Sequence, residues 1–141
     1  MNITTTAKIW FATVVLSLLL SSCCGFIKAE DLGHNFVLSE YDEVDRRILY
    51  TEDQCSGDGI EAVPMTVLEY AKNSKWIIAK SAESEVTTNL KYWVIDKDFE
   101  IAQSDDNISN VVKSHIYGPF DSTTFLSKLH NLNINLKLKK I

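Results

Sequence analysis

Two apolar stretches, Trp76-Ile77-Ile78-Ala79 and Tyr92-Trp93-Val94-Ile95, give the strongest prediction of secondary structure in this chain. Both are rich in the aromatic and β-branched residues that favour strands. They lie within segments 75–81 and 90–96, and the segment between them, 83–89, is polar. We therefore expect an antiparallel hairpin with a longer loop.

Adjacent residues of a strand point to opposite faces of the sheet, so the rings of Tyr92 and Trp93 are expected on opposite sides. One ring is expected in the core, which leaves the other as a candidate for exposure. An exposed aromatic ring on a sheet can bind a sugar or a protein partner. Tyr92 and Trp93 are therefore candidate contact residues, although ordinary cross-strand packing is the favoured alternative.

Shorter strands are predicted before this hairpin, at 34–39, 46–51 and 60–64, with an acidic turn after the first and a loop rich in Gly, Asp and Ser at 52–59. Segment 65–72 is ambiguous. Pro64 at its entry suits a helix, whereas Asn73-Ser74 at its end suits a tight turn between two strands. We favour a strand.

A helix is predicted near the end of the chain. Asp121-Ser122-Thr123-Thr124 is rich in residues that cap helix N-termini, and four apolar residues follow at helical spacing, up to about Asn131: Phe125, Leu126, Leu129 and Leu132. The alternating tail that follows predicts an edge strand, blunted by its lysines, or an exposed end. The class is α+β, an antiparallel β-meander packed against a C-terminal helix.

The N-terminal segment indicates export. Residues 1–22 contain Lys8 and no Asp or Glu, and their apolar run of about a dozen residues is shorter than the ~20 that a spanning helix needs. The run ends in Leu20-Ser21-Ser22-Cys23, which resembles the bacterial lipobox. This resemblance implies cleavage before Cys23, a diacylglycerol thioether on its sulfur and acylation of the new amino terminus. A plain signal peptide is the alternative.

The expected organisation is a signal peptide at 1–22, a lipidated tether at 23–33, one β-rich domain at 34–134 and a basic tail at 135–141. The whole chain has 14 basic and 19 acidic side chains, and removal of Lys8 leaves 13 against 19, a net charge of −6. An acidic domain has no electrostatic reason to bind nucleic acid. We expect it on the cell membrane or outer membrane, outside the cytoplasm and held by lipid on Cys23.

Two further cysteines remain, Cys24 and Cys55. An exported compartment permits a disulfide between them. Two unpaired thiols are the favoured alternative, because Cys24 would lie against the bilayer.

No pattern of catalytic or cofactor-binding residues is found. The sequence lacks a phosphate-binding glycine loop, a Gly-x-Ser-x-Gly elbow, Cys-x-x-Cys and His-Glu-x-x-His. His34, His115 and His130 are too far apart to form a helical metal-binding pair. Asp96, Asp98 and Glu100 begin like a calcium loop, but the pattern fails at its sixth and twelfth places. A looser calcium site shared with Asp105 and Asp106 is the alternative to a solvated acidic loop, which is favoured. We predict no catalytic residue, no cofactor and no metal.

Three motifs together resemble a family of small bacterial lipoproteins of unknown function: Trp76-Ile77-Ile78-Ala79-Lys80, Tyr92-Trp93-Val94-Ile95-Asp96-Lys97, and Gly118-Pro119-Phe120-Asp121 followed by Phe125. The resemblance covers about 33–134 and implies a single β-rich domain on a lipid tether. It implies no activity and no catalytic residues. The tail after Ile134 is expected to be an extension beyond the family pattern.

These observations favour a non-enzymatic, membrane-anchored module that binds an envelope protein or glycan. One alternative is an inhibitor or immunity-type protein, because the acidic segments 40–45 and 96–106 could cover a basic cleft of a toxin or lytic enzyme. The other is a hydrolase whose site is assembled from distant residues around His115 or His130.

Replacement of Cys23 by Ser tests the lipid anchor. Cys23→Ser is expected to abolish lipidation and to give an uncleaved precursor or a soluble form, because no sulfur remains to carry the lipid. Cell fractionation with mass spectrometry of the N-terminus measures this, and Cys24→Ser is the control. A Cys23→Ser protein that is cleaved normally and still sediments with membranes would contradict the prediction.

Overall fold

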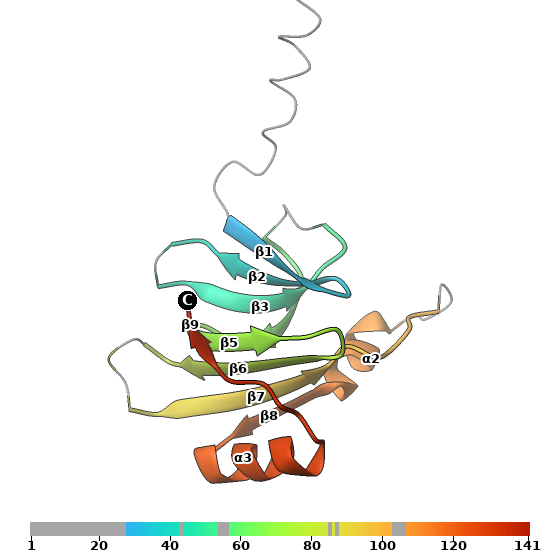
Figure 1. Ribbon diagram of the computed structural model, residues 1–141. Coiled ribbons are helices and arrows are strands. Elements are labelled where there is room, and N and C mark those ends of the chain that lie inside the picture. Colours follow the sequence, from blue (N-terminus) through green and yellow to red (C-terminus); the bar gives the residue numbers. More distant parts are fainter. Residues whose placement is uncertain (1–27, 43, 54–56, 85, 87, 103–106) are drawn as a thin grey trace, which may run out of the picture.

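The computed structural model describes residues 28–42, 44–53, 57–84, 86, 88–102 and 107–141. Its strands form two antiparallel sheets, shown in Figure 1. The first sheet has the order β1 (Lys28–Gly33), β2 (Phe36–Glu40), β3 (Arg46–Tyr50), β4 (Ile60–Val63). The second has the order β8 (Ile116–Phe120), β7 (Leu90–Asp96), β6 (Trp76–Ala82), β5 (Val67–Lys72), β9 (Lys139–Lys140). The helices are α2 (Ile108–Ser114) and α3 (Ser122–Asn131).

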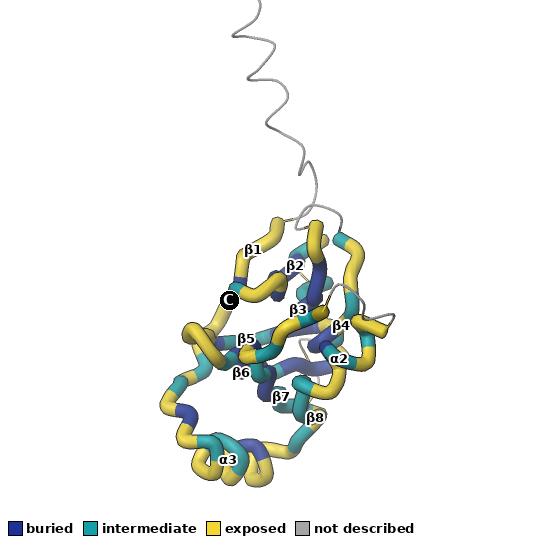
Figure 2. Tube along the Cα trace, turned by 90° about the vertical axis from the view of Figure 1, so that its right-hand side faces the viewer, coloured by how far each residue is buried: buried dark blue, intermediate teal, exposed yellow. Residues whose placement is uncertain are grey.

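The two sheets and α3 form three layers, with the second sheet in the middle (Figure 1). Residues between the two sheets form a first core, which includes Phe36, Ile48, Val63, Ile77 and Ile95. Residues between the second sheet, α3 and the C-terminal segment form a second core of Ala71, Ile78, Val94, Phe125 and Ile134. Figure 2 shows buried positions along the strands of both sheets.

The hairpin of β6 and β7 is buried on both faces. Ile77 pairs with Ile95 and belongs to the first core, whereas Ile78 pairs with Val94 and belongs to the second. A strand with one solvated face alternates apolar and polar residues, but a strand covered on both faces needs apolar residues at successive positions. The continuous apolar runs in the sequence are therefore explained by the middle position of this hairpin.

The α+β class is confirmed, with α3 against one face of the second sheet. The predicted hairpin of 75–81 and 90–96 is present, and segment 65–72 contains strand β5, which begins at Val67. The turn between β5 and β6 forms at Asn73, whose Oδ1 accepts from the backbone N–H groups of Lys75 at 2.9 Å and Trp76 at 2.7 Å. Local turn chemistry therefore favours this strand.

The predicted C-terminal helix is also confirmed, with Asp121 as its N-cap. Its carboxylate accepts from the backbone N–H of Thr124 at 2.8 Å and from the Thr124 hydroxyl at 3.2 Å. These hydrogen bonds lower the pKa of the Asp121 carboxyl. The prediction that Leu126 lies on the packed face is wrong, because its side chain is 61 % exposed. Phe125, Leu129 and Leu132 follow one helical face, and Leu126 is rotated about 100° away from Phe125.

Three segments differ from the sequence predictions. Lys28–Gly33, expected in the tether, forms edge strand β1, in which only Leu32 is buried. Its charged residues do not alternate with apolar ones as in a half-buried strand, so the sequence does not predict β1. Backbone pairing with β2 holds this segment in the extended conformation. Segment 107–115, not assigned from the sequence, contains α2, a seven-residue helix capped by Asn107. The tail contributes β9, a short strand that pairs with β5.

Polar contacts join β1, at the edge of the first sheet, to β5 of the second sheet. The Tyr70 hydroxyl donates to Glu30 Oε2 at 2.6 Å, and Lys72 Nζ lies 3.3 Å from Glu30 Oε1 and donates to the carbonyl oxygen of Asp31. Burial, together with this hydrogen bond and the charge of Glu30, raises the pKa of Tyr70 to about 12. These contacts close one side of the sandwich.

A buried lysine fixes the β1–β2 turn against the end of β7. Lys97 is 3 % exposed and its Nζ donates to the carbonyl oxygen of Leu32 at 2.7 Å. A Cβ on Gly33, where φ is +85°, would lie 3.1 Å from this nitrogen, so glycine suits both the backbone and the packing. Burial lowers the pKa of the Lys97 ammonium, and the charge of Lys72 lowers it further.

The doubly buried hairpin should tolerate truncation poorly. Ile78→Ala is expected to lower the free energy of unfolding by about 2–5 kcal/mol, because it leaves a cavity in a packed core. Leu126→Ala is the matched control and should change it by no more than about 0.5 kcal/mol. Equilibrium urea unfolding measures both, and equal effects of the two substitutions would contradict the layered core.

Lys97 should make stability depend on pH. Its pKa is lower in the folded chain than in the unfolded chain, so between the two values the unfolded chain binds more protons. The free energy of unfolding of the wild type, relative to Lys97→Met, should therefore rise as the pH increases toward the ordinary value of 10.5. Urea unfolding over the alkaline range measures this. Lys113→Met, which removes an exposed lysine of α2, is the charge control, and identical slopes in all three proteins would refute the assignment.

Candidate functional site

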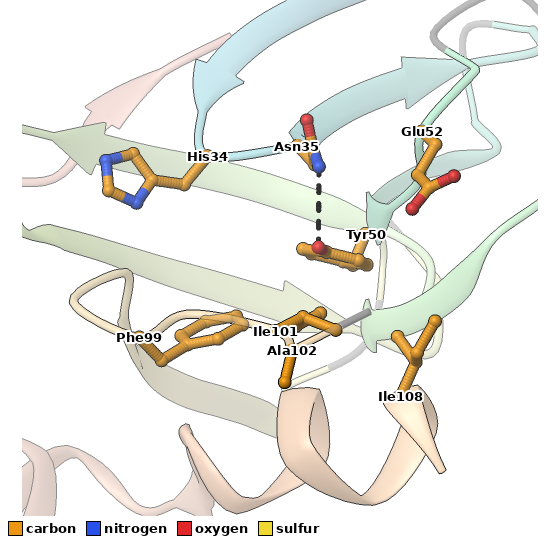
Figure 3. A pocket seen from close by; sticks show the side chains of 8 residues that line it. All are labelled: His34, Asn35, Tyr50, Glu52, Phe99, Ile101, Ala102 and Ile108. Carbon is orange, nitrogen blue, oxygen red and sulfur yellow. Dashed lines mark hydrogen bonds between the residues drawn. The ribbon is translucent and has the colours of Figure 1, made fainter. Parts of the chain in front are cut away.

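A cleft of about 680 Å³ opens where the β1–β2 turn faces the segment between β7 and α2 (Figure 3). Polar side chains from the first sheet and apolar side chains from the segment that leads to α2 come together there. The described residues that line it are His34, Asn35, Tyr50, Glu52, Phe99, Ile101, Ala102 and Ile108.

The polar edge of the cleft is the two-residue turn between β1 and β2. His34 and Asn35 connect β1 to β2, and both have left-handed backbone conformations, with φ of 54° and 63°. A two-residue hairpin turn of this kind usually contains Asn-Gly or Asp-Gly. His and Asn are among the non-glycine residues that adopt this conformation most readily. Here Lys97 and the β1–β2 pairing hold the turn.

His34 is oriented by a hydrogen bond to the backbone. Its Nδ1 lies 2.6 Å from the carbonyl oxygen of Lys97. Because a carbonyl oxygen only accepts, Nδ1 must carry the proton. In the neutral ring, Nε2 is then the nitrogen with a lone pair. The exposed His34 ring therefore offers a fixed acceptor at the edge of the cleft.

Aromatic rings form the floor. Tyr50 packs edge-on against Phe36 at a centroid distance of 5.2 Å, and Phe99 lies 6.1 Å from Tyr50 and 6.2 Å from Phe36. Asn35 Nδ2 donates to the Tyr50 hydroxyl at 3.4 Å, which joins the polar edge to the floor. Phe36 is fully buried in the first core, so the floor is part of the packed interior.

The three histidines lie in different places. His34 is at the cleft, and His115 stacks behind Phe99 at a centroid distance of 4.5 Å. His115 Nδ1 lies 2.9 Å from the carbonyl oxygen of Val111 and 3.1 Å from Ser114 Oγ. His130 is exposed on α3, in another layer of the molecule. Both His34 and His115 therefore direct Nδ1 to backbone carbonyl oxygens.

The acidic segment after β7 does not gather into a metal site within the described part of the chain, where no group of three His, Cys, Asp or Glu side chains could hold an ion. Asp98 forms an ion pair with Lys75 at 3.1 Å, and Asp96 accepts from the backbone N–H of Asp98 at 2.9 Å. Asp105 and Asp106 lie outside the described residues.

The aromatic candidates from the sequence pack inside the layers. Tyr92 stacks on Phe125 at a centroid distance of 4.9 Å, on the α3 side of the second sheet. Trp93 packs against the first core, and its Nε1 donates to Ser81 Oγ at 2.9 Å. Both rings are half-buried and lie on opposite faces, as the strand geometry requires. Their observed role is cross-strand and interlayer packing.

The predicted lipidation site Cys23 and the candidate disulfide partners Cys24 and Cys55 lie outside the described residues. Within the ranges that the structure describes, no helix is both long enough and apolar enough to cross a membrane.

The cleft follows no local sequence pattern, because its lining residues come from four separate segments. The sequence predicts a strand from His34, whereas β2 begins at Phe36. Gly33, His34 and Asn35 are consecutive residues of types that tolerate positive φ, and this succession is the signal that could have predicted the turn.

Neither the curated proteins nor the solved structures include a match to this chain. Residues 33–141 match the family described as protein of unknown function DUF3997. This match reaches Ile141, so the expectation that the tail after Ile134 lies beyond the family pattern is wrong. The matched residues include the β1–β2 turn, the cleft, both helices and the tail, and the chain belongs to the DUF3997 family.

Proposed function

We propose that this protein is a membrane-anchored envelope lipoprotein whose domain binds a small saccharide in the cleft. The observation that carries the proposal is the cleft itself, in which the turn of His34 and Asn35 is held above an aromatic floor. We favour binding over catalysis for two reasons. The cleft is concave and has hydrogen-bonding groups at its edge. The Nδ1 atoms of His34 and His115 are already bonded to backbone carbonyl oxygens.

The chemistry of the cleft suits a sugar ring. Apolar faces of sugars stack on aromatic side chains, and their hydroxyl groups need donors and acceptors nearby. Phe99 and Tyr50 supply the apolar surface, and Asn35, His34 and Glu52 supply polar groups at its edge. Glycans of the envelope would be within reach of an anchored domain, which makes them the favoured ligand class.

The proposed anchor would hold the cleft away from the bilayer. Strand β1 begins at Lys28, five residues after Cys23, and an extended chain of five residues spans at most about 18 Å. The cleft lies at the other end of β1, whose six residues extend about 20 Å. A lipid on Cys23 would therefore hold the near end of this strand and leave the cleft end free for a ligand.

Asn35→Gly tests the cleft with little disturbance of the fold, because glycine accepts the positive φ and only the side chain is lost. Its dissociation constant for a soluble peptidoglycan disaccharide is expected to rise roughly two- to tenfold, the effect of one lost hydrogen bond. Calorimetric titration of the full-length protein in uncharged detergent micelles measures this.

Asn133→Gly is the matched control, because Asn133 also has positive φ, 52°, but follows α3 in another layer. It should leave the dissociation constant unchanged. Equal weakening by both variants, or no saccharide binding by the wild type, would contradict the proposal.

A further inference from the structure

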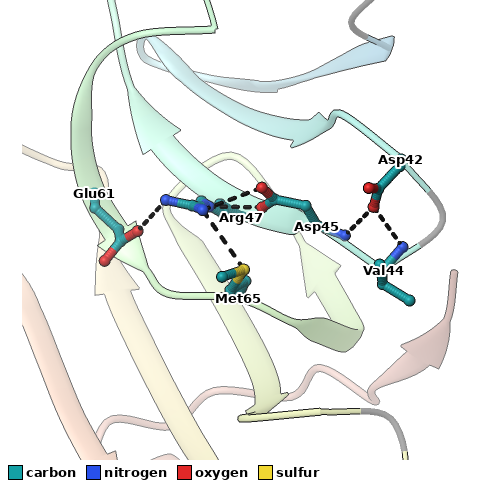
Figure 4. A network of polar contacts seen from close by, with 6 residues as sticks. All are labelled: Asp42, Val44, Asp45, Arg47, Glu61 and Met65. Atoms are coloured by element: carbon teal, nitrogen blue, oxygen red, sulfur yellow. Dashed lines mark hydrogen bonds and ion pairs between the residues drawn. The ribbon is translucent and has the colours of Figure 1, made fainter.

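A second exposed surface lies at the opposite end of the first sheet from the cleft. Strand β2 begins beside the His34–Asn35 turn and ends at Glu40, and the turn that follows exposes Tyr41 (66 %) and Val44 (56 %). Met65, between β4 and β5, is 47 % exposed and lies beside this turn (Figure 4). We call Tyr41, Val44 and Met65 the apolar patch.

The members of the apolar patch line two neighbouring hollows. Val44 and Met65 line a hollow of about 260 Å³ together with Asp45, Thr66, Glu83 and Ser84. Tyr41 lines a neighbouring hollow of about 320 Å³, whose wall includes Asp45, Arg47, Asp58 and Glu61. Asp45 lines both, so the two hollows adjoin at this side chain.

Polar contacts hold this surface in shape before any partner binds. Asp42 Oδ1 accepts from the backbone N–H groups of Val44 at 2.9 Å and Asp45 at 2.7 Å. Arg47 contacts both carboxylate oxygens of Asp45, at 2.7 and 3.1 Å, and it also reaches Glu61 Oε2 at 3.2 Å and Met65 Sδ at 3.5 Å. A preformed surface loses less side-chain entropy on binding.

The surroundings of the patch carry a negative charge. Four carboxylates, Asp45, Asp58, Glu61 and Glu83, are among the described residues that line the two hollows. Arg47 also lines one of these hollows, and its guanidinium already forms ion pairs with Asp45 and Glu61. Asp42 adds a further carboxylate at the turn. The electrostatic potential there therefore favours a cationic partner.

One buried hydroxyl in the same hollow has no hydrogen-bond partner. Thr66 is 2 % exposed, and its Oγ1 is without a partner in the described part of the chain. Thr66 lines the hollow beside Val44 and Met65, so its backbone amide reports on a group bound there.

We propose that the apolar patch docks a protein partner that presents an apolar side chain flanked by Lys or Arg. The apolar side chain would pack between Val44 and Met65, and the cationic groups would face Asp45, Asp58, Glu61 and Glu83. This site is separate from the cleft, so the protein joins a saccharide ligand at one end of the first sheet to a basic protein at the other.

The test uses NMR of the isotope-labelled full-length protein in uncharged detergent micelles, with two synthetic probes. One is a peptide of alternating Lys and Leu, and the other is its counterpart of alternating Glu and Leu. The Lys peptide is expected to shift the backbone amides of Tyr41, Val44, Met65 and Thr66, and the Glu peptide to leave them unchanged. Added salt should weaken the binding.

Val44→Ser should weaken binding of the Lys peptide roughly fivefold through the loss of apolar contact area. Leu126→Ser, at a similarly exposed apolar residue on α3, should leave the binding unchanged. Equal binding of both peptides, shifts confined to the cleft or the tail, or no shift at all would overturn the proposal. Concentration-dependent shifts of these amides without peptide would show that a second copy of the chain occupies the patch, which would also overturn it. None of these outcomes bears on saccharide binding at Asn35.

Discussion

The packing of the β6–β7 hairpin against two different layers is the constraint on which the rest of the structure depends. Ile77 and Ile95 contact the first core, and Ile78 and Val94 contact the second. These four positions are covered on both faces and must exclude water, so they need apolar residues, whereas Lys80, further along β6, is paired with Glu69 at 2.8 Å. The register of the hairpin, with Ile77 opposite Ile95 and Ile78 opposite Val94, therefore aligns both cores at once. A shift by one residue would exchange the side chains between the two cores.

The two surface sites are consequences of this arrangement. Phe36, Ile48 and Val63 pack the first sheet against the hairpin. Strand β2 runs through the first sheet from the His34–Asn35 turn to the turn that follows Glu40. The turn at its start forms the edge of the cleft, and the turn at its end carries Tyr41 and Val44 of the apolar patch. Lys97 extends from the end of β7 to the first turn, so the hairpin also positions the cleft. Rigid elements hold both sites, and the polar residues that define them lie on turns, where function usually resides.

Strong local patterns made much of the fold predictable. The apolar runs predicted β6 and β7, the Asn73 turn favoured β5, and Asp121 with the apolar spacing that follows predicted α3. The division into two sheets was not predictable in this way, because it depends on which faces meet in three dimensions. Strand β1 is charged and is ordered by its pairing with β2, and α2 buries only Val112. The cleft combines His34, Glu52, Phe99 and Ile108, which no local pattern connects.

Native-state hydrogen exchange tests the central claim most directly, because it reports the free energy of opening at each backbone amide. If the doubly packed hairpin is the constraint, the amides of Ile77, Ile78, Val94 and Ile95 should exchange slowest, and only through global unfolding. Amides of β1 and β9, at the sheet edges, should exchange through smaller local openings. Slower exchange in β2 and β3 than in β6 and β7 would contradict the account, because the first sheet would then persist after the hairpin had opened.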